Sequence, residues 1–326
     1  MKQRIRLIYI LAASHSGSTL LAMLLGSHPE ICTVGEIKFT SLGDIDRYLC
    51  SCHKKIRECS FWNRITQDMA ERGFSFDIAN AGTDYRSGTT PYVSRLLRPL
   101  HRGPVFEKIR DIALTFSPNW RYQLHRVHAA NTNLIQCILA RTGKKVIVDS
   151  SKIGIRLKYL LRNPSLDVRV IRLIRDGRGV TLAHLNPSLY ADAQNPHHRG
   201  GGMGENINAE HCSVDKAANL WRSSNVEADA ILKQLEPNRF TEVRYETLCK
   251  YPYETLYRLS TFSGVNPGKM IINFRSIEHH IVGNGMRLDL GDDINLDEKW
   301  RSDLTKADLA VFDSICGKLN TKYGYV

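Results

Sequence analysis

The sequence lacks any apolar run that approaches the 18 or so residues needed to cross a membrane, and it lacks internal repeats and low-complexity tracts. The missing apolar run argues against a membrane span, so we expect a soluble protein. Cysteine is also scarce. Eight cysteines in 326 residues are too few for a disulfide scaffold, so a cytoplasmic location is expected.

The amino terminus superficially resembles a secretion signal. MKQRIRLIYILAAS has a basic start, a short apolar run and small residues after it. The same run also fits a buried strand over 5–12 that enters a glycine turn. We favour the strand, because the apolar run is short and the turn after it carries hydroxyls and a histidine.

The composition is that of an ordinary globular protein. With 42% hydrophobic and 24% charged residues, disorder, collagen and coiled coil are excluded. The 45 lysines and arginines exceed the 33 acidic residues, which leaves a net charge of +12. This surplus favours anionic partners, among them nucleotides, sulfated or phosphorylated sugars, acidic peptides, nucleic acid and anionic membrane.

Strand patterns alternate with helical ones, which predicts an α/β fold with a mainly parallel central sheet flanked by helices. We expect one domain over 1–326, with an insertion at about 74–118 and a lid-like loop at about 186–211. The predicted strands are 5–12, 145–149, 168–174 and 240–244. The predicted helices are 19–26, a stretch after Gly35, 61–73, 121–141, 152–162, a stretch after Asp176, and 214–235.

The first strand leads into a turn that is suited to an anion. Its residues are Ser14, His15, Ser16, Gly17, Ser18 and Thr19, and a helix follows. Backbone N–H groups and the positive helix end converge there, each helix-end contact being worth about 0.3–2 kcal/mol, so the hydroxyls must help. The alternative is an ordinary capped turn. It is not a Walker A loop, which has a lysine where Gly17 stands before Ser18.

Two further strand ends carry cations. Arg175 and Arg178 follow the strand 168–174, with Asp176 between them as a helix cap, and Lys152 ends the segment VDSSK. Open α/β sheets bind ligands at the carboxyl ends of their strands, and an arginine fork can hold a phosphate bidentately. Together with the first turn, these positions suggest a nucleotide with phosphates at two separate places.

These segments resemble a known family. LAASHSGSTLLAMLLGSHPEICTVGE, VIVDSSK and VRVIRLIRDGRGV are similar to sulfotransferases that use 3′-phosphoadenosine-5′-phosphosulfate (PAPS), especially bacterial members and the tyrosylprotein branch. The likeness extends weakly through Trp221, Asn225, VRYETL and GNGMRLDLGDDINLDEKW. It implies a P-loop-NTPase-like fold, a first loop that binds the 5′-phosphosulfate, and Arg175 on the 3′-phosphate. Tyr245 and Arg287 are further nucleotide-site residues by this resemblance.

Two positions depart from the family. Lysine or arginine is usual where this chain has His15, whose ordinary pKa near 6.5 leaves both the neutral and the charged form open. A serine that holds the 3′-phosphate is usual eight residues after the strand-end arginine, where this chain has Ala183. Thr181, His184 or Arg287 would have to take up that contact.

The resemblance also implies roles in transfer. By analogy with phosphoryl transfer, the transition state is loose and in line. Lys152 and His15 are candidates for the cation at the bridging oxygen, and the turn N–H groups with Ser16 and Ser18 are candidates for the sulfuryl oxygens. Glu36 in TVGE matches the catalytic glutamate of the tyrosylprotein branch, and we expect a raised pKa for it. His15 is the second candidate base, and Glu36 as a simple helix cap is the alternative. The scheme requires no metal.

The acceptor is not readable beyond a hydroxyl on a sugar, lipid, tyrosine or small alcohol, with an acidic or carbohydrate acceptor in keeping with the charge. No nucleic-acid partner is expected, and the oligomeric state is open. A P-loop kinase or NTPase, or a non-catalytic binder of acidic glycans or nucleotides, are the alternatives. The kinase or NTPase would share the fold, and the binder would need only the basic surface.

A separate cluster has no place in this scheme. Cys50, Cys52, His53 and Cys59 form a C-x-C-H-x5-C pattern, which could hold zinc or form a disulfide. Zinc-binding cysteine pairs usually have two residues between them, so the spacing is irregular and we assign no metal site. His279 and His280 lie near the late loop without an assigned role.

Overall fold

The computed structural model describes residues 4–40, 42–98, 103–202, 212–291 and 293–326. Its centre is a five-stranded sheet in the order β2-β3-β1-β4-β5, and every neighbouring pair is parallel. The strands are β1 (Ile5–Ala12), β2 (Ile31–Thr33), β3 (Val146–Lys152), β4 (Leu166–Ile174) and β5 (Phe240–Arg244). This confirms the predicted α/β class with a mainly parallel sheet.

The central strand is buried on both faces, as parallel sheets require. Leu7 to Leu11 are at most 2% exposed, and Tyr9 pairs with Asp149 of β3 and Val170 of β4. Because all strands run the same way, their carboxyl ends meet at one edge. The chain leaves that edge into α1 (Ser18–Gly26), α6 (Gly154–Leu160), α7 (Gly177–Leu185) and α11 (Tyr245–Lys250).

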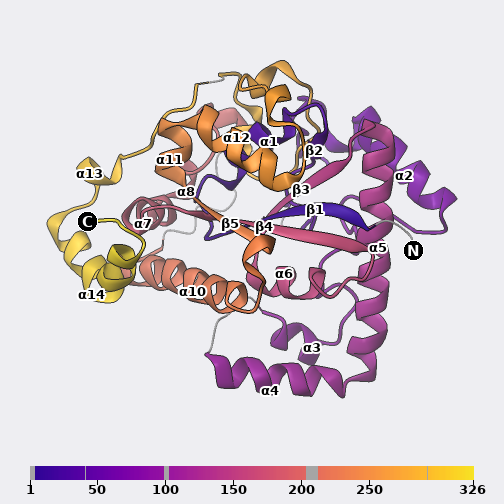
Figure 1. Ribbon diagram of the computed structural model, residues 1–326, viewed down its shortest axis with the longest axis horizontal. Coiled ribbons are helices and arrows are strands. Elements are labelled where there is room, and N and C mark those ends of the chain that lie inside the picture. The colour runs from indigo at the N-terminus through magenta and orange to yellow at the C-terminus, as the bar shows by residue number, and fades with distance from the viewer. Residues whose placement is uncertain (1–3, 41, 99–102, 203–211, 292) are drawn as a thin grey trace.

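Helices cover both faces of the sheet (Figure 1). Leu7, Tyr9 and Leu11 pack with residues of α2 (Ser60–Glu71), α5 (Pro118–Thr142), α6 and α10 (Val214–Leu232). The alternate residues Ile8 and Ile10 pack with α1, α11 and α12 (Pro252–Ser263). The alternation follows from the two-residue period of a strand. α14 (Lys306–Lys322) packs on α10 and α7 beside the sheet edge.

Shorter elements fill the predicted insertion and loop. The segment 74–118 contains α3 (Pro91–Leu96) and α4 (Pro104–Thr115), and its residues 99–102 lie outside the described part. The segment 186–211 contains α8 (Pro187–Tyr190), η2 (Pro196–His198) and α9 (Arg199–Gly202). Residues 203–211 of this segment lie outside the described part of the chain. The remaining short helices are η1 (Ile56–Glu58), η3 (Pro237–Arg239), η4 (Pro267–Lys269), η5 (Phe274–Ser276), η6 (Gly285–Leu288) and α13 (Trp300–Asp303).

One predicted element is wrong. The stretch after Gly35 is not a helix. Contacts with residues far away in the sequence fix its conformation, and the local sequence pattern cannot predict such contacts. Gly35 forms a parallel bridge with Val282, and a Cβ at position 35 would lie 2.0 Å from the Val282 carbonyl oxygen. Its φ of 80° also favours glycine. Among the described residues, no helix combines the length and the apolar character that crossing a lipid bilayer demands.

Candidate active site

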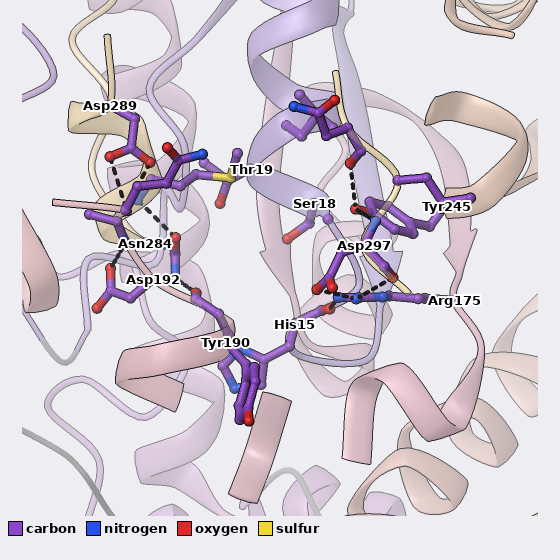
Figure 2. A pocket seen from close by; sticks show the side chains of 18 of the residues that line it. His15, Ser18, Thr19, Arg175, Tyr190, Asp192, Tyr245, Asn284, Asp289 and Asp297 are labelled. Carbon is purple, nitrogen blue, oxygen red and sulfur yellow. Dashed lines mark hydrogen bonds and ion pairs between the residues drawn. The ribbon is translucent and has the colours of Figure 1, made fainter. Parts of the chain in front are cut away.

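A cavity of about 740 Å³ opens at the carboxyl ends of β1, β3 and β4. Open parallel sheets bind ligands at this edge, where the chain order switches direction. Most of the predicted site residues line it: Ser14, His15, Gly17, Ser18, Thr19, Glu36, Lys152, Arg175 and Tyr245. Figure 2 shows that side chains from the first loop, from Arg175 directly after β4 and from the late part of the chain converge on it.

The first loop leaves the amino end of α1 without a side-chain cap. Gly17 is the N-cap residue, at φ 85°, and as a glycine it has no side chain that could accept from the first N–H groups of this helix. Ser18 and Thr19 are buried in its first turn and line the cavity. Uncapped N–H groups and two hydroxyls at a positive helix end are a favourable place for an anion.

Tyr245 packs against the first loop at Gly17. Its ring lies so close to Gly17 that a Cβ there would meet the ring at 2.6 Å. The ring also lies under the Arg175 guanidinium, 4.6 Å from its centroid, which is a cation–π distance. Tyr245 therefore packs against both predicted anion sites at once.

Arg175 is buried and its guanidinium is hydrogen-bonded to protein groups. One guanidinium nitrogen donates to the His15 carbonyl oxygen at 2.8 Å, and a second donates to the Asp297 carboxylate at 2.8 Å. The Trp221 indole N–H donates to the Arg175 carbonyl oxygen at 3.2 Å. Arg175 thus ties the first loop to the late segment, and a carboxylate occupies the position where an anionic ligand would compete for the guanidinium.

Glu36 is ionised in this structure. Its carboxylate, 17% exposed, pairs with the Lys152 ammonium and with the Lys38 ammonium at 3.2 Å. Burial alone would raise the pKa of Glu36, but Lys152 and then Lys38 outweigh it and lower the pKa to about 2. The raised pKa that the sequence suggested for Glu36 is therefore wrong. The expectation omitted two lysines that a sequence cannot place beside this carboxylate.

His15 is neutral here. Burial is the largest cause, and His184, Lys152 and Arg175 add to it, so that the pKa of His15 falls to about 3. The ring meets that of His184 edge to face at 4.5 Å, and burial lowers the pKa of His184 to about 4. Of the two predicted cations, the Lys152 ammonium is thus the one that carries charge into the cavity.

Three predicted ligand-binding residues do not line the cavity. Ser16 is 1% exposed, and its hydroxyl has no hydrogen-bond partner within the described part of the chain; the buried Thr181 hydroxyl is in the same state. Ala183 is buried in α7. Arg287 is 1% exposed, donates to backbone carbonyls of Gly283 and Asn284, and stacks on Tyr48. Its guanidinium holds the late loop together.

Sequence reasoning missed the wall of the cavity that the late part of the chain forms. Asp297 opposes Arg175, the Asp289 carboxylate accepts from the Gln194 N–H at 3.0 Å, and the Asn284 amide donates to the Ala191 carbonyl oxygen (Figure 2). These contacts hold residues 190–194 against the cavity. The acidic run DLGDDINLDEKW belongs to a segment that resembles the family, but no role was assigned to its carboxylates from the sequence.

The chain was compared with protein-family models, curated proteins and solved structures. No protein-family model matches the chain, and no curated protein matches it in sequence. A sulfotransferase domain from the curacin biosynthetic pathway is 17% identical, with 98% of each chain covered and a TM-score of 0.49. The sulfotransferase domain of a Synechococcus olefin synthase is 17% identical, with 100% of this chain and 98% of that one covered and a TM-score of 0.48.

A mouse sulfotransferase complexed with PAP is 11% identical, with 99% of this chain and 90% of that one covered and a TM-score of 0.44. These structures are sulfotransferases, which is the family that the motifs of the first loop and of β4 resemble. With identities of 17% or lower and TM-scores below 0.5, they leave the activity to be argued from the site itself.

Proposed function

We propose that the protein transfers a sulfuryl group from PAPS to a hydroxyl-bearing acceptor. One observation carries the proposal: the uncapped amino end of α1, the Arg175 guanidinium and the Lys152–Glu36 ion pair all line one cavity. Two anion-binding positions fit a nucleotide that is charged at both its 5′ and its 3′ side. The ion pair between a lysine and a carboxylate supplies an acid and a base for group transfer.

The donor would bind with its two charged ends apart. The phosphosulfate lies at the first loop, where the N–H groups and hydroxyls of Ser18 and Thr19 line the cavity. The 3′-phosphate takes the guanidinium of Arg175 in exchange for the Asp297 carboxylate. A charge-assisted bond of this kind contributes about 1.5–3 kcal/mol.

The transfer then uses Lys152 and Glu36 in turn. The acceptor oxygen attacks sulfur, the bond between sulfur and the 5′-phosphate oxygen breaks, and adenosine 3′,5′-bisphosphate leaves. The Lys152 ammonium turns from Glu36 to the departing oxygen, where negative charge develops. Glu36 then loses the stronger of its two counter-charges and keeps Lys38, so its pKa rises from its present low value and it can take the acceptor proton.

A nucleotide kinase is the less favoured activity, because Gly17 stands where the phosphate-binding lysine of a Walker loop would be. Calorimetric titration with adenosine 3′,5′-bisphosphate and with ATP–Mg²⁺ separates the two. We expect tighter binding of the bisphosphate. Tighter binding of ATP–Mg²⁺ would reject the sulfotransferase assignment.

Turnover decides between an enzyme and a binding protein. The assay follows ³⁵S from labelled PAPS into panels of sugars, lipids, tyrosine peptides and small alcohols, with Glu36→Gln as the matched inactive control. We expect label transfer to one class by the wild-type protein and none by the variant, with equal bisphosphate affinity in both. Binding of the bisphosphate without transfer to any class would identify a non-catalytic nucleotide binder.

A further inference from the structure

Three cysteines and one histidine meet in a cluster that the candidate active site does not use. The ligand atoms of Cys50, Cys52, Cys59 and His280 all lie within 4.8 Å of one another. Cys50 and Cys59 are completely buried, Cys52 is partly buried, and the His280 side chain is 18% exposed. The cluster joins a loop near the amino end of the chain to a segment more than 200 residues away.

Four of the six distances between the ligand atoms are those of a tetrahedral metal site. The Cys59 sulfur lies 3.7 Å from that of Cys52 and 3.8 Å from that of Cys50. His280 Nδ1 lies 3.7 Å from the Cys50 sulfur and 3.4 Å from the Cys59 sulfur. Four ligands around one zinc ion, at about 2.3 Å for sulfur and 2.0–2.1 Å for nitrogen, place sulfurs about 3.8 Å apart and sulfur and nitrogen about 3.6 Å apart.

The backbone of the cysteine loop supports this arrangement. His53 adopts a left-handed conformation at φ 61°, and its N–H donates to the Cys50 carbonyl oxygen at 2.8 Å. The tight turn brings Cys50 and Cys52 to one side although a single residue separates them. Cys59 is the N-cap residue of α2, so a thiolate there lies at the positive end of a 12-residue helix.

The histidine is oriented for metal binding as well. Its ring stacks on Phe61 with centroids 4.4 Å apart and planes 6° apart, which fixes its rotation. Nδ1 faces the sulfurs, and Nε2 faces the Glu278 carboxylate at 3.7 Å. Metal-binding histidines commonly present their second nitrogen to a carboxylate. Apolar packing alone would not turn a ring nitrogen toward three sulfurs.

We propose that Cys50, Cys52, Cys59 and His280 bind one Zn²⁺ ion that serves a structural role. Four protein ligands leave no open position, as is typical of structural rather than catalytic zinc. Soft thiolates with one imidazole select zinc over magnesium or calcium. The spacing is irregular because the fourth ligand is not His53, which lies beside His198, but a histidine from the far end of the chain.

The ion would hold the wall of the cavity in place. The Ser51 hydroxyl accepts from the Ile281 N–H at 2.8 Å, and the Tyr48 hydroxyl accepts from the Gly283 N–H at 2.7 Å. Two residues beyond His280, the Val282 carbonyl oxygen accepts from the Glu36 N–H at 3.3 Å. Binding at His280 therefore fixes the strand-like segment on which the backbone of the candidate base rests.

Metal content tests the proposal directly. The full chain, purified without an affinity tag that binds metal, is analysed for zinc by mass spectrometry. We expect about one zinc ion per chain, loss of that zinc in Cys52→Ser, and retention in the control Cys249→Ser, which changes a thiol outside the cluster. His280→Ala and its neighbour control His279→Ala form a second pair.

Cobalt substitution keeps the test valid if a variant does not fold. Wild-type protein in which Co²⁺ replaces zinc should show the visible absorption of a tetrahedral site and a thiolate charge-transfer band. Zinc at background in the wild-type protein, with no such spectrum, would overturn the proposal. An intact mass lower by two hydrogens, indicating a disulfide within the cluster of the purified protein, would overturn it as well.

Discussion

Replacing Glu36 by glutamine should remove a defined part of the acid sensitivity of the fold. In the structure the carboxylate is paired with Lys152 and Lys38, which lower its pKa from an ordinary 4.5 to about 2 despite burial. The substitution keeps the shape of the side chain and removes its charge. Any cost of leaving the two lysines without a carboxylate is common to all pH values compared.

The direction and the size of this pH effect on stability follow from the linkage between proton binding and folding. A folded-state pKa below the unfolded one contributes stability that is present above pH 4.5 and is lost as pH falls through about 2. The difference between these pKa values, about 2.5, corresponds to about 3 kcal/mol. By pH 3 about 2 kcal/mol of this is lost, so the stability gap between wild type and Glu36→Gln should narrow by that amount between pH 6 and pH 3.

Urea unfolding at pH 6, 5, 4 and 3 measures the gap, with Glu30→Gln as the control. Glu30 also pairs with a lysine, Lys145, at 2.8 Å, but on the surface. Its gap should change less with pH and should shrink with added salt. A Glu36 gap that stays constant from pH 6 to pH 3 would refute the ion pair, and with it the argument that Lys152 keeps the candidate base ionised.

Four other substitutions probe the cavity. Lys152→Ala should lower kcat about 10²–10³-fold with a smaller change in bisphosphate affinity, and equal losses in steady-state kinetics and calorimetry would reduce it to a binding residue. Arg175→Ala should weaken bisphosphate binding about 10–150-fold in the same calorimetry, and unchanged affinity would exclude it from the site. Asp297→Asn should strengthen that binding several-fold, because it removes the carboxylate that competes for the guanidinium; weaker binding would contradict this competition. Gly17→Ala should lower the unfolding free energy by more than about 1 kcal/mol, since φ is 85° and the Tyr245 ring leaves no room for a Cβ, and an unchanged Tm would contradict that packing.

The sequence was informative where local pattern and fold agree. The buried run of β1 and the strand β5 are found at the predicted residues, because continuous apolar stretches between turns have few other uses in an α/β chain. The first loop, Lys152 and Arg175 share a cavity because parallel strands deliver their carboxyl ends to one edge. These residues could be predicted without knowing a single tertiary contact.

The missing parts are set by contacts between distant segments. Glu36 was expected to be protonated more readily, and only the fold shows that Lys152 lies against it, 116 residues away in the chain. Arg287 was expected on a phosphate, but its guanidinium is enclosed by backbone carbonyls and Tyr48. The pairing of His280 with the cysteine loop has the same origin. The residue type predicts what a side chain can bind, and long-range packing decides which group lies next to it.

Strained backbone conformations occur at the cavity and at the cysteine loop. Within the described residues, four non-glycine residues have positive φ: His15, Phe39, His53 and Lys152. Two of them line the cavity, and a third turns the cysteine loop. Such conformations cost of order 1–3 kcal/mol each and persist where the surroundings fix them. At Lys152 the strain coincides with a register shift between β1 and β3, which re-aims a side chain at the strand end. Glycine would relieve the backbone there but would remove the ammonium that faces Glu36, so the conformation is retained for what the side chain reaches.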